Sequence, residues 1–97
     1  MTYASVIERQ ALISGFRELA DFLEGNPEVP APKYAYMLVF PPLASDAENR
    51  SEIDVIASRI GSGTEISSPR SHYVTSRQFG PVEYRAVAIP SDENKEQ

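Results

Sequence analysis

The stretch that most constrains this chain is RQFGPVEYRAVAIP, residues 77–90, because it predicts two neighbouring β-strands joined at Gly80-Pro81. On both sides of the Gly-Pro step the residues alternate like those of a strand with one buried face. We expect these strands at residues 72–79 and 82–89. The more apolar set, expected to face the helices of the domain, is Val82, Tyr84, Ala86 and Ala88.

The length of the hairpin turn decides which residues share a face of the sheet. With a two- or four-residue loop, Gln78 lies opposite Glu83. A three-residue loop with Gly80 in a bulge shifts the register by one residue and turns the first strand over. In either register Glu83 and Arg85 lie on the face away from the helices, so both alternatives leave them available for contacts.

Two helices are expected before the hairpin. Residues 5–24 repeat apolar side chains at the spacing of one helical face, and Gly25 and Pro27 end the helix. The second helix begins at Ser45, which forms a capping box with Glu48, and ends at Gly61. The two apolar stripes are Leu12, Phe16, Leu19 and Leu23, and Ile53, Ile56, Ala57 and Ile60.

The segment KYAYMLVF, residues 33–40, predicts a strand whose two faces are both largely apolar. Such a strand is typical of the middle of a sheet, so we expect it to be a central strand. Pro41 and Pro42 end it, because neither proline can donate to a ladder. A short strand is also expected at residues 64–67.

The expected fold is therefore a two-layer α+β sandwich in the order α-β-α-(β)-β-β. Two helices cover one face of a small mixed or antiparallel sheet of about three or four strands. Residues 33–79 can form a strand-helix-strand crossover, right-handed if its strands are parallel. We expect one domain over residues 1–90 and a disordered acidic tail over residues 91–97.

Composition narrows the classes of function. The chain has no cysteine, which excludes disulfides and thiolate chemistry and fits a reducing cytoplasm. The formal net charge of −5 disfavours direct nucleic-acid binding. The longest apolar run, residues 34–40, is too short to span a bilayer, and the first ten residues lack the features of a signal peptide. We expect a cytoplasmic protein without membrane contact.

No residue pattern predicts catalysis. His72 is the one histidine, and no acidic residue lies beside it at the spacing of metal ligands. The chain has no nucleophile elbow and no phosphate-binding loop. We therefore expect no metal, no cofactor and no enzymatic activity.

The hairpin face that bears Glu83 and Arg85 is the remaining candidate site. Arginines there can hold a carboxylate or phosphate in a forked geometry, and a tyrosine can stack on a ligand. The alternative is a purely structural, cross-strand Glu-Arg pairing. The candidate ligand- or partner-binding residues are Arg77, Arg85, Tyr73, His72 and Glu83.

Three segments carry a resemblance: ALISGFRELADFLEGNPEVPAP, SDAENRSEIDVIASRIG and HYVTSRQFGPVEYRAVAIP. Together they resemble a group of small uncharacterised proteins of actinobacteria such as Streptomyces and of their phages and mobile elements. The resemblance covers residues 11–90 and implies a bacterial or phage cytoplasmic setting. It brings no activity, cofactor or catalytic residue with it.

These observations favour a non-enzymatic interaction or regulatory module. We expect it to self-associate, for example as a homodimer, or to bind a partner protein through an exposed sheet face or an edge strand. A second hypothesis is a domain that binds a small anionic ligand or a nucleotide on the hairpin. A third is a regulator or mimic of nucleic acid in a phage or its host.

Overall fold

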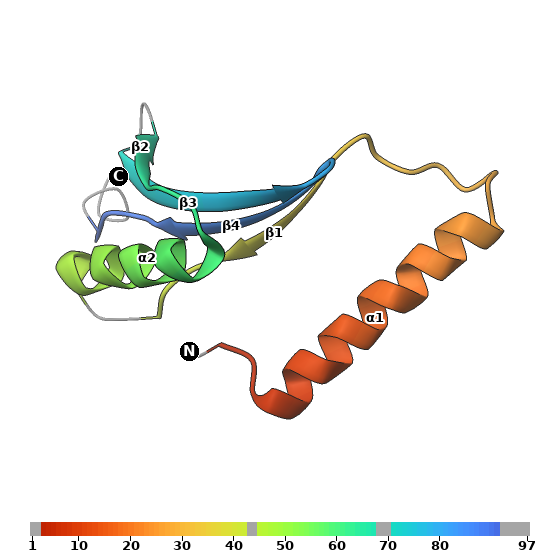
Figure 1. The fold of residues 1–97 in the computed structure, drawn as a ribbon, viewed down its shortest axis with the longest axis horizontal. Coiled ribbons are helices and arrows are strands. Elements are labelled where there is room, and N and C mark those ends of the chain that lie inside the picture. The colour runs from red at the N-terminus through yellow and green to blue at the C-terminus, as the bar shows by residue number, and fades with distance from the viewer. Residues whose placement is uncertain (1–2, 43–44, 68–70, 92–97) are drawn as a thin grey trace. The chain divides into compact units, whose positions relative to one another are not determined.

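The computed structural model describes residues 3–42, 45–67 and 71–91, which belong to two compact units, Met1–Lys33 and Tyr34–Gln97 (Figure 1). The expectation of one domain over residues 1–90 stays a prediction. Of the expected acidic tail, only Ser91 lies within the described residues. Its backbone N–H donates to Asp46 Oδ1 at 3.0 Å, and its hydroxyl donates to Asp46 Oδ2 at 3.1 Å.

The first unit contains one long helix, α1, Val6–Gly25. Ser5 caps it through a reciprocal box in which the Glu8 N–H donates to Ser5 Oγ at 3.1 Å and the Ser5 N–H donates to Glu8 Oε1 at 2.8 Å. The predicted helix over residues 5–24 is confirmed, but none of its residues is buried. The expectation that this helix covers the sheet stays a prediction.

The described residues of the second unit form a four-stranded mixed sheet and the helix α2, which confirms the α+β class. Its elements are β1 (Ala35–Val39), α2 (Asp46–Ile60), β2 (Glu65–Ser67), β3 (His72–Phe79) and β4 (Val82–Ala88). The strand order is β1-β4-β3-β2, with β1 parallel to β4 and the other neighbours antiparallel. The crossover through α2 therefore joins β1 and β2, which are the two edges of the sheet (Figure 1).

The prediction that the strand within residues 33–40 is central is wrong: β1 is an edge strand. β4 is the last of the described strands, and it enters between β1 and β3, so β1 has one neighbour among these strands. Apolar alternation reports which faces of a strand suit burial. It does not report how many strands lie beside it.

The hairpin between β3 and β4 has the shortest of the three loop lengths considered, a loop of two residues. Phe79 pairs with Val82 across the two-residue turn Gly80-Pro81, so Gln78 lies opposite Glu83. Gly80 has φ 64°, the positive value that a hairpin turn with glycine at its first central position needs. The register with a bulge at Gly80 does not occur.

The core lies between α2 and one face of the sheet. Ile53 is fully buried and packs with Ile56 against Ala86 and Ala88 of β4. The small alanines let the helix approach the strands closely, as expected for the set that faces a helix. Partly buried side chains complete the cluster: Val39, Ile60, Tyr73 and Tyr84.

Candidate functional site

Within the described part of the chain, the outer edge of β1 presents backbone groups that pair with no other strand. The Ala35 N–H donates to the Pro81 carbonyl at 3.2 Å, so Ala35 points its backbone groups towards β4. Residues alternate along a strand, so Tyr36 and Leu38 point their N–H and C=O groups away from β4, to the side where the sheet ends. This edge is a template for another strand.

The same stretch carries an apolar row on the face of the sheet turned away from α2, which we call the far face. Tyr36 and Leu38 lie beside Glu83 and Arg85 in the parallel register, and those two side chains belong to the far face. The apolar row consists of Tyr36 and Leu38 together with Tyr34 and Phe40, which lie just outside the strand and continue its alternation in the sequence. The exposed fractions are 65% for Tyr34, 64% for Tyr36, 53% for Leu38 and 49% for Phe40.

Apolar exposure on the far face is concentrated at β1. Val74 and Val87 lie opposite each other in the hairpin, on the same face as Glu83, yet they are only 3% and 7% exposed. Exposed apolar side chains are therefore not a general feature of the far face. Among the described strands they gather at β1, which lies at the edge of the sheet.

The charged pair on the far face joins two residues of β4, whereas the expected structural pairing crossed from one strand to the next. Glu83 is buried, and its Oε2 accepts hydrogen bonds from Arg85 Nε at 3.2 Å and lies 3.2 Å from Arg85 Nη2. Burial of a carboxylate is costly unless a partner compensates its charge, and the Arg85 guanidinium supplies that compensation. A ligand anion at Arg85 would have to compete with Glu83.

The five predicted site residues do not share one face. The register places His72, Glu83 and Arg85 on the far face, whereas Tyr73 and Arg77 point to the face on which α2 packs. Arg77 is exposed there, and its guanidinium lies 5.1 Å from the centre of the Phe79 ring. The structure therefore does not assemble Arg77, Arg85, Tyr73 and His72 into one anion site.

Tyr73 serves instead as a link between α2 and the strands. Its hydroxyl donates to Asp54 Oδ1 at 2.6 Å and lies 3.0 Å from Thr64 Oγ1, next to the start of β2. The Arg50 guanidinium lies 5.6 Å from the centre of the Tyr73 ring. These contacts join α2, β3 and the approach to β2, so they favour a structural role.

The opposite edge, β2, offers less to another strand. The Ser76 carbonyl accepts from Ser62 Oγ at 2.7 Å, which places the backbone groups of Ser76 on the β2 side of β3. By alternation Val74 and His72 also point to β2, so their partners Glu65 and Ser67 point inward. Ile66 alone of the three residues of β2 points its backbone groups to the free side.

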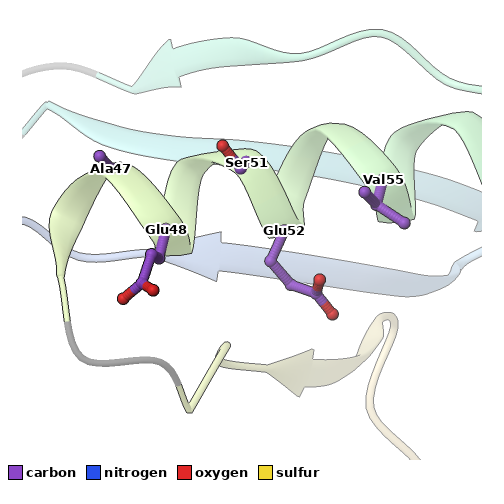
Figure 2. Close-up of a pocket in the computed structure, with 5 residues that line it drawn as sticks. All are labelled: Ala47, Glu48, Ser51, Glu52 and Val55. Atoms are coloured by element: carbon purple, nitrogen blue, oxygen red, sulfur yellow. The ribbon is translucent and has the colours of Figure 1, made fainter.

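A shallow hollow of about 310 Å³ lies along α2 and is lined by Ala47, Glu48, Ser51, Glu52 and Val55. In Figure 2 the carboxylates of Glu48 and Glu52 both point to the side of α2 on which β1 lies in that view. Glu48 also holds the capping box of the helix, with its N–H 3.1 Å from Ser45 Oγ. The described lining comes from one helix, so the hollow does not enclose a ligand.

Over the described ranges, no cluster of three or more histidine, cysteine, aspartate or glutamate residues is arranged to hold a metal ion. Neither described helix combines the length and the apolar character that crossing a bilayer requires. The expectations of no cofactor and no catalysis stay predictions.

Reasoning from the sequence missed the edge residues Tyr36 and Leu38. The available signal was the segment itself, which is apolar on both faces and uncharged from Tyr34 to Phe40. Burial in the middle of a sheet and pairing with another chain both favour that pattern, so it did not distinguish the two.

Comparison with known proteins adds no further assignment: no protein family, no curated protein and no solved structure matches this chain.

Proposed function

We propose that this protein is a protein-interaction module that binds an extended segment of another protein chain along the free edge of β1. The observation that carries the proposal is the uncharged edge strand Ala35–Val39, whose Tyr36 and Leu38 combine outward backbone groups with side chains that are 64% and 53% exposed. Natural edge strands are usually protected by charge, proline or a bulge. β1 contains no charged residue and no proline.

Addition of a strand uses two kinds of contact. Backbone hydrogen bonds to Tyr36 and Leu38 supply affinity that depends little on the sequence of the partner segment. The apolar row supplies selectivity, because it favours a segment whose alternate side chains are aromatic or aliphatic. The partner expected from this chemistry is an extended, alternately apolar segment of a protein.

Selection from a random peptide library on the immobilised full-length protein tests this proposal. We expect enriched peptides to alternate apolar and variable positions. In Leu38→Pro the outward N–H is removed while the ladder between β1 and β4 is kept, because Leu38 does not donate to β4. The enriched peptides should bind this variant at least about tenfold more weakly, measured by fluorescence polarisation.

The matched control is Ile66→Pro, which removes the outward N–H of the other edge strand. Its peptide binding should equal that of the unmodified protein. Absence of enriched peptides, or equal binding to the Leu38→Pro variant, would overturn the proposal. Circular dichroism of both variants checks that the sheet is retained.

A further inference from the structure

We infer that the strand which β1 accepts is the β1 strand of a second copy of this chain, paired antiparallel about a two-fold axis at Met37. The inference rests on the proposed use of β1 as a docking edge and adds the identity of the partner. Two-fold symmetry requires the same patch on both copies, so β1 must be complementary to itself.

The sequence around Met37 meets that requirement. In this register Tyr36 lies opposite Leu38 of the second copy, and both have outward backbone groups, so each such pair can exchange its N–H and C=O hydrogen bonds. Ala35 then lies opposite Val39, and Tyr34 opposite Phe40. No charged residue meets another anywhere between Tyr34 and Phe40.

The prolines around β1 limit pairing to the same window. Pro32 and Pro42 lie equally far from Met37 on its two sides, and neither has an N–H to donate. The pairing therefore uses the whole of β1 and stops at both ends, whereas any shifted register leaves part of the strand unpaired.

The position of α2 leaves room for the second copy. α2 packs chiefly on β3 and β4, and Val39 of β1 packs against the same core. Strands lie about 4.8 Å apart, so two strand spacings keep α2 roughly 10 Å from the seam between the copies. A continuous sheet across the seam places the apolar rows of both copies side by side on the far face.

The apolar area that the two copies can bury sets the expected affinity of the dimer. A fully buried aromatic side chain covers about 150–250 Å², and the four residues of the apolar row are each about half exposed. The two rows together therefore contribute at most roughly 800 Å², below the roughly 1,200–2,000 Å² of a stable standard interface. We expect a weak dimer with a dissociation constant of roughly 10–100 µM.

Sedimentation of the full-length protein from about 5 µM to about 500 µM, a range that brackets the expected dissociation constant, tests for the dimer. The weight-average mass should rise from one chain towards two. A mass that stays at one chain over the whole range would overturn the inference, and this measurement needs no variant.

The register is tested by single cysteines, because the chain has none of its own. In Met37→Cys the two cysteines lie opposite each other in a non-hydrogen-bonded pair, with Cα atoms about 4.5 Å apart, within the range of a disulfide. In the matched control Leu38→Cys, each cysteine lies opposite Tyr36, and its counterpart is too far for a bridge. Under mild oxidation Met37→Cys should form the linked dimer at least about tenfold faster.

Equal rates for the two cysteine variants would overturn the two-fold register. Failure of this inference is distinguishable from failure of the proposed function. A protein that stays monomeric but binds library peptides in a way that Leu38→Pro abolishes retains the docking edge and loses only the second copy as its partner. A protein that neither self-associates nor binds library peptides would contradict both the proposed function and the two-fold dimer.

Discussion

The two edges of one sheet differ in how they are protected. β2 has three residues, includes Glu65, and presents the backbone groups of Ile66 alone to its free side. β1 has five residues, carries no charge, and presents those of Tyr36 and Leu38. Short length and charge are the usual means of preventing edge-to-edge pairing. The sheet uses them at β2 and omits them at β1.

The exposure of β1 is therefore confined to one edge and does not extend over the whole sheet. The same sheet is covered by α2 over its middle strands and is linked towards β2 by the Tyr73 hydroxyl. An unprotected edge in an otherwise protected sheet is the arrangement expected of a docking strand. Four measurements test whether the two edges differ in this way.

The largest effect is expected where the covered strands meet α2. Ile53 is fully buried against β4, so Ile53→Ala should lower the free energy of unfolding by about 2–5 kcal/mol, measured by urea denaturation. Val55→Ala on the same helix, where the side chain is 43% exposed, is the control and should cost less than about 1 kcal/mol. Equal losses would mean that α2 does not anchor the sheet as described.

The next effect contrasts the two edges directly. Leu38 and Ile66 are matched aliphatic residues, 53% and 59% exposed, on β1 and β2. Leu38→Glu should weaken self-association about tenfold, or about 1.4 kcal/mol, because it places a charge within the apolar row. Ile66→Glu should leave the dissociation constant unchanged in sedimentation. An equal effect of both substitutions would remove the distinction between the edges.

A smaller effect is expected at the link towards β2. Tyr73→Phe removes the hydroxyl that donates to Asp54 and should cost about 1 kcal/mol of unfolding free energy. Tyr36→Phe on β1 changes a hydroxyl on a side chain that is 64% exposed and should change stability by less than about 0.5 kcal/mol. The prediction fails if thermal or urea unfolding shows the same change for both.

The smallest effect is expected from the salt concentration, acting on the dissociation constant of the dimer. Each copy carries a formal net charge of −5, so two copies repel each other at long range. Raising NaCl from about 0.05 to about 0.5 M should screen this repulsion and tighten the dimer about two- to threefold. Tightening indicates that apolar and backbone contacts hold the copies together. A dimer that weakens with salt would show that ion pairs hold it instead.

Local elements were largely predictable from the sequence. Ser45 and Glu48 predicted the start of α2, and Gly61, with φ 70°, ends it as expected. The hairpin was predictable as a pair of strands, yet its register was left open, since both registers agreed with the alternation of apolar and polar residues. The two-residue turn was decided by the observed pairing of Phe79 with Val82.

The candidate site was less predictable for a related reason. Period-two alternation placed Glu83 and Arg85 together on one face, and their ion pair follows from it. The faces of Arg77 and Tyr73 depended on the register, so their separation from Arg85 needed the structure. Tyr36 and Leu38 were visible as strand residues, but nothing local marked them as residues of an edge.

The helices, the strands and the side chains that suit burial follow from the amino-acid sequence, because capping, turn chemistry and apolar periodicity act over a few neighbouring residues. The tertiary structure alone decided that β4 lies between β1 and β3 and that β1 is an edge. Strand order depends on contacts between segments far apart in the chain. No local pattern in KYAYMLVF records which strand lies beside it.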